Sequence, residues 1–160
     1  MIRDAKIEDA QDICGIYNHY IKNTPTTFET ERVSEDIMVE RIVNISENFF
    51  WIVYEKDGRI LGYAYASSFK SRSAYNNSVE CSIYIRADEK GKGIGSTLLS
   101  QLINRCRERG FHTIIGTITL PNEGSIALHE KFGFKKAAHF KEVGYKFNTW
   151  IDVGSWQLLL

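Results

Sequence analysis

Hydrophobic positions recur at helical spacing in the N-terminal part of the chain. Apolar residues lie three or four positions apart across residues 7–21, which predicts an amphipathic helix after a short strand at residues 2–5. Ser34 is a favourable N-cap residue, so a second helix is expected to follow it. The apolar face expected for this second helix is looser and consists of Ile37, Val39, Ile42 and Ile45.

The middle of the chain changes to β-branched and aromatic residues. Residues 49–54 and 60–66 flank a Lys-Asp-Gly turn at residues 56–58, which predicts a β-hairpin. A polar loop at residues 67–78 separates this hairpin from a further strand expected at residues 79–86. This part of the chain is therefore predicted to form a sheet.

Helices and strands alternate in the rest of the chain. A glycine-rich stretch opens a helix expected at residues 95–109, a strand is expected at residues 112–118, and a short helix at residues 122–132. Residues 134–160 suggest a closing hairpin. The order predicts an α/β fold in a single domain spanning residues 1–160, with a mixed central sheet.

Composition narrows the classes of partner. The 160 residues include 20 Lys plus Arg and 20 Asp plus Glu, so the formal net charge is zero. Such a balance argues against a nucleic-acid partner or an anionic membrane partner. The N-terminal residues are too charged for a signal peptide, and no apolar stretch reaches membrane-spanning length, so a cytoplasmic location is expected.

Cysteine usage fits the same expectation. Cys14, Cys81 and Cys106 are widely spaced and form neither a Cys-x-x-Cys pair nor a metal-ligand cluster. We therefore expect reduced, packed thiols and no metal site.

The glycine-rich stretch, residues 90–95, carries the strongest chemical signal. A strand that runs through a glycine turn into a helix presents backbone N–H groups and the positive end of the helix dipole, which suits a pyrophosphate. A P-loop requires Gly-Lys-Ser/Thr, whereas Ser96 follows Gly95 here, and Leu98 replaces the third glycine of a dinucleotide fingerprint. Taken alone, the turn fits a ligand-free connector about as well as a ligand site.

A second motif favours a ligand site over a ligand-free connector. The Lys-Gly-Lys-Gly-Ile-Gly turn resembles the Arg/Gln-x-x-Gly-x-Gly/Ala turn of the GCN5-related N-acetyltransferase (GNAT) superfamily, with lysine replacing the usual Arg or Gln at Lys90. Residues 122–134 resemble the second signature of that superfamily, in the expected order. The resemblance implies a GNAT-type fold with helices on both faces of the sheet, and acetyl-CoA as cosubstrate.

Peripheral segments point to a narrower family. Residues 16–21, 70–75, 79–80 and 150–157 resemble the phosphinothricin and methionine sulfoximine N-acetyltransferases, and the resemblance runs nearly end to end. It implies direct transfer of an acetyl group to the amine of a small amino-acid-like acceptor. Relatives are commonly homodimers, so a homodimer is also expected.

Two side chains are candidates for proton transfer. Strand alternation places Glu80 on the polar face of the strand that enters the glycine turn, and the resemblance implies a general base at this position; a salt-bridged carboxylate is the alternative. His129 occupies the position where many members of the superfamily carry a tyrosine that protonates the leaving thiolate. A packed helix residue is the alternative for His129.

The resemblance also implies a set of cofactor contacts, on the strand after Glu80, in the glycine turn and at the start of the last helix. These contacts are Ile83, Tyr84, Ile85, Lys90, Gly91, Lys92, Gly93, Ile94, Gly95, Ser96, Asn122 and Ser125.

For the acceptor, Arg72 could bind a carboxylate through two parallel hydrogen bonds, with Lys70 and Tyr75 beside it. Phe28 could wall the pocket. The alternatives are a solvated basic loop for the first three residues and a core aromatic for Phe28. Two other functions stay open, namely acetylation of protein or peptide amines, and a non-catalytic coenzyme A-binding module.

Overall fold

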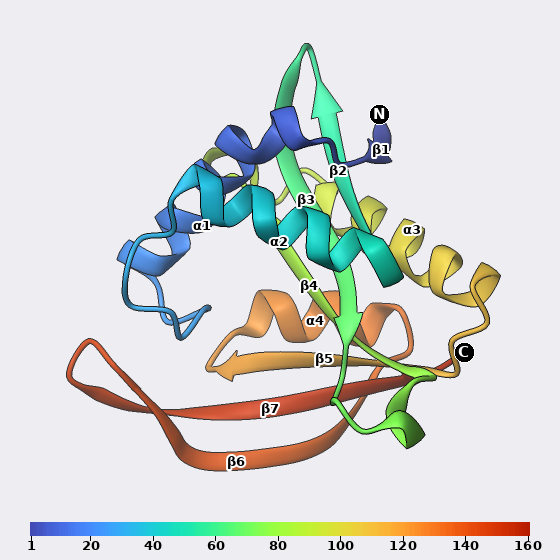
Figure 1. Cartoon of the computed structure of the whole chain (residues 1–160). Coiled ribbons are helices and arrows are strands. Elements are labelled where there is room, and N and C mark those ends of the chain that lie inside the picture. The colour runs from blue at the N-terminus through green and yellow to red at the C-terminus, as the bar shows by residue number, and fades with distance from the viewer.

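A seven-stranded mixed sheet forms the centre of the molecule in the computed structural model, which describes all residues 1–160 (Figure 1). The strands are ordered β1-β2-β3-β4-β5-β7-β6. Their bounds are β1 Ile2–Asp4, β2 Phe50–Lys56, β3 Arg59–Ser68, β4 Ser78–Ile85, β5 Thr113–Leu120, β6 Lys135–Lys146 and β7 Thr149–Leu159.

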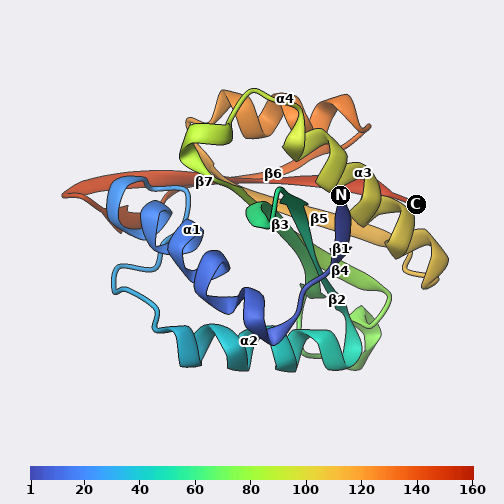
Figure 2. The same ribbon diagram turned by 90° about the horizontal axis from the view of Figure 1, so that it is seen from above.

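Helices cover both faces of this sheet, as the resemblance implied. Figure 2 shows α1 and α2 on one side and α3 and α4 on the other. The α-helices are α1 Ala10–Asn23, α2 Glu35–Asn48, α3 Ile94–Glu108 and α4 Glu123–Lys131, and short 3₁₀ turns span Ile7–Asp9, Ser73–Tyr75 and Ala87–Glu89. None of the helices is long and apolar enough to cross a membrane.

The sheet divides the hydrophobic core into two layers. Leu98, Leu99 and Leu102 of α3 are fully buried against one face of the sheet. On the other face, α1 and α2 pack over β2 and β3, where Ile13 and Tyr63 are almost fully buried. The two layers hold the sheet rigidly between them.

The predicted elements are confirmed, with boundaries shifted by a few residues at most. Ser34 caps α2, and its hydroxyl accepts a hydrogen bond from the Ile37 amide at 3.3 Å. Asp57 and Gly58 both have positive φ, as an Asp-Gly hairpin turn requires.

The predicted apolar face of α2 is wrong in part. Met38 and Ile42 are the buried residues of this helix, whereas the Ile37 side chain is 45% exposed. Val39 and Ile45 are partly buried against the same core cluster as Ile42, as predicted, so Ile37 is the one predicted residue of this face that does not pack inward.

The pairing of β4 and β5 is short and leaves an opening in the sheet. These two strands are parallel and pair only from Ser78 opposite Thr113 to Cys81 opposite Gly116. Beyond that point, β4 stays paired with β3 as far as Ile85, while β5 follows β7. The two strands therefore diverge, and Figure 1 shows the open angle between them.

Candidate active site

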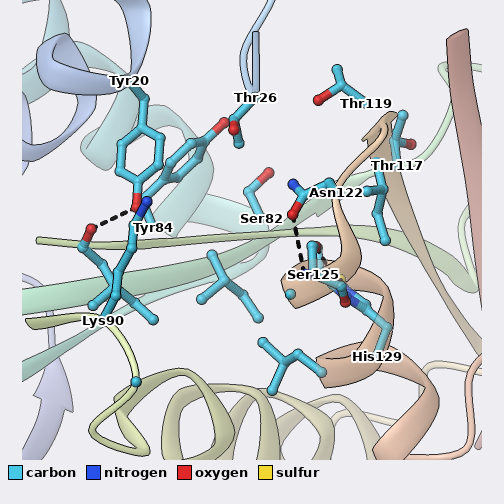
Figure 3. Close-up of a pocket in the computed structure, with 17 residues that line it drawn as sticks. Tyr20, Thr26, Ser82, Tyr84, Lys90, Thr117, Thr119, Asn122, Ser125 and His129 are labelled. Atoms are coloured by element: carbon cyan, nitrogen blue, oxygen red, sulfur yellow. Dashed lines mark hydrogen bonds between the residues drawn. The ribbon is translucent and has the colours of Figure 1, made fainter. Parts of the chain in front are cut away.

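A cavity of about 370 Å³ lies in the angle between β4 and β5. In Figure 3, Tyr20 and Lys90 lie on one side of this cleft and Asn122, Ser125 and His129 on the other. Residues 82–85 of β4 have a strand partner on one side only, so their other main-chain edge borders the cleft. An extended ligand that carries amide groups can bind such an edge as an added strand does.

The glycine turn closes one end of the cleft. Gly91 and Gly93 have φ values of 78° and 82°, which disfavour any residue with a Cβ, and Gly93 is the N-cap of α3. The first main-chain amides of α3 have no partner within the helix and carry its positive dipole end. This arrangement fits the pyrophosphate that the sequence motif predicts.

Other residues of the turn have separate roles. A Cβ on Gly95 would lie 3.0 Å from Ile85 Cδ1 and 3.2 Å from Leu128 Cδ2, so the absence of a side chain lets α3 begin close to β4 and α4. The Lys90 ammonium lies 4.9 Å from the centre of the Tyr20 ring, while the Lys92 ammonium pairs with Glu89 at 2.9 Å. Lys90 is therefore the cation of the turn that no carboxylate neutralises.

Glu80 does not line the cleft itself but is next to Cys81 and Ser82, which do, and it shares with Tyr84 the face of β4 that points toward α1 and α2. It pairs with Ser67 and Ile115 in the sheet and takes part in none of the ion pairs of the structure. Burial raises the pKa of the Glu80 carboxyl, and the nearby Thr117 hydroxyl partly offsets that rise. An unpaired carboxylate of raised pKa next to a cleft is suited to accept a proton.

His129 lines the far wall of the cleft but points its ring into protein. Nδ1 lies 2.8 Å from the Ser125 carbonyl oxygen, which can only accept, so Nδ1 carries the proton of the neutral ring. Nε2 faces the Cys81 thiol at 3.8 Å, and burial lowers the pKa of His129. A Cβ on Gly116 would lie 2.8 Å from this ring, so the imidazole packs against bare backbone. The geometry favours the packed-residue alternative over a proton donor.

The predicted acceptor residues do not line this cleft. Lys70 and Tyr75 border a separate hollow of about 320 Å³, and the Lys70 ammonium lies 5.4 Å from the Tyr75 ring centre. Arg72 is exposed, and its guanidinium forms no ion pair. Phe28 is 39% exposed and packs against Gly144. The polar loop that carries Arg72 leads directly into β4 and Glu80.

Several residues that line the cleft were not predicted as site residues, although Tyr20 lies in the segment 16–21 that resembles the narrower family. The Tyr20 hydroxyl donates a hydrogen bond to the Ile85 carbonyl at 2.7 Å, and Thr26 reaches the cleft from the loop after α1. Thr117 and Thr119 are hydroxyl residues on one face of an otherwise apolar strand, and that alternation was the one available clue to these two. The others come from segments distant in sequence.

Comparisons with known proteins agree with this geometry. A family model described as an acetyltransferase (GNAT) domain matches residues 2–154. A phosphinothricin N-acetyltransferase of Streptomyces viridochromogenes is 35% identical over 156 residues, which cover 98% of this chain and 85% of that protein. An L-methionine sulfoximine/L-methionine sulfone acetyltransferase of Pseudomonas aeruginosa is 34% identical, covering 99% of this chain and 94% of that protein.

Solved structures show the same fold. A phosphinothricin acetyltransferase from Sinorhizobium meliloti, in complex with acetyl-CoA, superposes with a TM-score of 0.97 at 38% identity, covering 100% of this chain and 88% of that chain. A ribosomal-protein-alanine N-acetyltransferase from Brucella melitensis superposes with a TM-score of 0.98 at 34% identity, covering 100% of this chain and 99% of that chain.

The Thr117 hydroxyl gives a direct test of the electrostatics at Glu80. Thr117→Val removes a hydroxyl that stabilises the charged carboxylate, so the pKa of Glu80 is expected to rise further above its usual value. Titration of the side-chain carboxyl by NMR measures the change, with Thr149→Val on the exposed start of β7 as control. An unchanged or lowered pKa in Thr117→Val would refute the contact.

Proposed function

The chain belongs to the GNAT family of acetyltransferases and is an acetyl-CoA-dependent N-acetyltransferase; from this premise we propose that it acetylates the α-amine of a small amino acid or amino-acid analogue. The acceptor class we propose resembles phosphinothricin or methionine sulfoximine. The observation that most supports a transfer reaction is the unpaired Glu80 carboxyl of raised pKa beside the cleft between β4 and β5.

We assign the binding of acetyl-CoA to the cleft. The main-chain edge of residues 82–85 would bind the pantetheine arm, and the free amides after Gly93 would bind the pyrophosphate. Lys90, Asn122 and Ser125 border the same cleft. Main-chain N–H groups of β4 would stabilise the negative charge that develops on the thioester oxygen.

Glu80 is assigned as the base that takes a proton from the acceptor ammonium, directly or through one water molecule. The amine nitrogen would then attack the thioester carbon directly. Burial raises the pKa of the Cys81 thiol, whose sulfur faces His129, and raises that of Cys106 to about 12. Neither cysteine supplies a thiolate for an acyl-enzyme route. Thiolates are good leaving groups, so the account assigns no proton donor for this step.

The acceptor carboxylate is assigned to Arg72, whose guanidinium is free and can form two parallel hydrogen bonds. Lys70 and Tyr75 lie in the same segment, and Phe28 supplies an exposed apolar surface. All four residues would need to meet the acceptor at the side of β4 that bears Glu80. This assignment is supported by the likeness to phosphinothricin and methionine sulfoximine acetyltransferases, whereas none of the four residues lines the cleft.

Acetylation of protein or peptide amines is the second candidate. The likeness to a ribosomal-protein-alanine N-acetyltransferase at 34% identity favours it. A peptide acceptor has no free α-carboxylate next to its reacting amine, so Arg72 would then lack the partner that we assign to it. A non-catalytic coenzyme A-binding module would not require an unpaired carboxyl group at Glu80.

For assembly, we propose a homodimer that buries the exposed aromatic surface of the β6–β7 hairpin. Tyr145 and Trp150 face each other across the hairpin with ring centres 4.8 Å apart, and both are more than half exposed. The proposed location is the cytoplasm, where the three buried thiols stay reduced. The balanced charge favours neither nucleic acid nor membrane as a partner.

An acceptor panel tests the proposed reaction. Thiol release from acetyl-CoA is followed against amino acids, phosphinothricin, methionine sulfoximine, simple amines and peptides, and turnover is expected only with acceptors that have a free α-carboxylate. Turnover with peptides alone would support the second candidate. Tight acetyl-CoA binding without any turnover would support the non-catalytic module.

Glu80→Gln tests the base. The amide cannot accept the proton, so kcat is expected to fall about 10²- to 10⁴-fold while the Kd for acetyl-CoA stays unchanged. Glu29→Gln is unsuitable as a control because Glu29 is bound by Arg41, so Glu142→Gln on the exposed part of β6 serves instead. A Glu80→Gln enzyme with full kcat would contradict the assignment.

Arg72→Lys tests the carboxylate contact. Lysine keeps the charge but loses the paired geometry, so the KM for an α-amino acid is expected to rise roughly tenfold. The KM for an amine without a carboxylate should not change, which makes the second acceptor an internal control. Equal changes in the KM for both acceptors would show that Arg72 does not bind the acceptor carboxylate.

Trp150→Lys tests the assembly. A charged side chain in the aromatic surface is expected to convert the dimer into a monomer, measured by light scattering coupled to gel filtration. The matched control is Leu159→Lys, at an exposed position near the other end of β7. A wild-type protein that is monomeric across the concentration range would contradict the proposal.

A further inference from the structure

Lys146, the last residue of β6, has a buried ammonium group with no carboxylate at ion-pair distance, although the Glu29 carboxylate is near enough to favour its charged form. Only 5% of the residue is exposed, and no ion pair includes it. Its Nζ instead donates hydrogen bonds to the carbonyl oxygens of Thr24 at 2.9 Å and Thr27 at 2.8 Å. Burying a cation costs free energy, so this contact needs an explanation in the structure around it.

Both carbonyls belong to the loop of residues 24–29 between α1 and α2, which we call the acceptor loop. This loop contains no helix or strand, so its position depends on side-chain contacts. Thr26 lines the cleft, as Figure 3 shows. The Thr27 hydroxyl lies 2.8 Å from the Tyr17 hydroxyl. The loop therefore forms a wall of the site only while it is held in place.

The same strand holds the loop at a second point. A Cβ on Gly144 would lie 2.2 Å from Cζ of Phe28, so the ring of Phe28 rests on the bare backbone of β6. At the end of the loop, Arg41 of α2 binds Glu29 through two hydrogen bonds of 2.6 and 2.9 Å. Two of these three anchors, Lys146 and Gly144, come from β6.

We propose that Lys146 is a positioning residue that fixes the acceptor loop, so that Thr26 and Phe28 stand in the wall of the acceptor site. This inference rests on the proposed function, because it gives the loop its role in acceptor binding. Lys146 contacts neither Glu80 nor the glycine turn, and it does not line the cleft that we assign to acetyl-CoA. Its removal should affect acceptor binding and leave acetyl-CoA binding intact.

Lys146→Met keeps the length of the apolar stem and removes the two hydrogen bonds. The KM for the acceptor is expected to rise roughly tenfold, with kcat changed much less and the Kd for acetyl-CoA unchanged. Hydrogen exchange followed by mass spectrometry should show faster exchange in residues 24–29 and unchanged exchange in α3. Lys141→Met, at an exposed position on the same strand, is the matched control and should match the wild type in every measurement.

Gly144→Ala provides an independent variant, because its methyl group displaces Phe28 without changing any charge. Like Lys146→Met, this variant should raise the KM for the acceptor. A folded Lys146→Met protein with wild-type acceptor KM and wild-type exchange in residues 24–29 would overturn the proposal. So would a parallel loss of kcat, acceptor binding and acetyl-CoA binding with a lowered Tm, which indicates a general structural role.

Failure of the proposed function gives a different result. A wild-type enzyme that turns over no amino-acid acceptor refutes that function, and the hydrogen-exchange comparison still decides whether Lys146 holds the loop. Normal wild-type turnover with no effect of Lys146→Met refutes only the role of Lys146.

Discussion

The parallel strands β4 and β5 separate after Cys81 and Gly116, and the cleft forms because of this separation. Buried main-chain N–H and C=O groups need partners, and the divergence leaves one edge of β4 without a neighbouring strand. That edge is accessible from the cleft, where an extended ligand can complete the pairing. The start of α3 lies at one end of the cleft and the start of α4 borders it, so the main-chain edge and a helix N-terminus are both placed where one ligand could contact them.

Glu29 and Glu80, both on the α1 and α2 side of the sheet, have opposite pKa shifts. Arg41 binds the Glu29 carboxylate and lowers its pKa, so Glu29 stays charged and fixes the end of the acceptor loop. Glu80 has no cation beside it, and burial raises its pKa. Groups whose environments separate their pKa values in this way divide into structural and proton-transferring roles. The cation that Glu80 lacks would be the acceptor ammonium.

Much of the fold could be predicted from local patterns. The Asp-Gly turn, the Ser34 cap and the glycine turn before α3 each follow from the chemistry of a few neighbouring residues. The choice between Ile37 and Met38 at the start of α2 could not, because both residues are apolar and only packing against the core decides which is buried. The tether at Lys146 was also unpredictable, since it joins segments more than a hundred residues apart.

The site, too, could be predicted only in part from the sequence. The glycine motif located the turn, and strand alternation together with the resemblance gave Glu80, whose role as the base stays a prediction. The hydrogen bond from His129 Nδ1 to the Ser125 carbonyl depends on a ring orientation that sequence does not specify. Lys70 and Tyr75 were expected at the acceptor, but the structure places them in a separate hollow, and their role stays a prediction.

Hydrogen exchange measured on the wild-type protein with and without acetyl-CoA shows whether the cleft binds the cosubstrate through main-chain amides. Acetyl-CoA is expected to slow exchange at the amides of residues 82–85 and of the first turn of α3, because these amides bind it. Tight binding with protection confined to other segments, or no binding by the folded protein, would refute this binding mode.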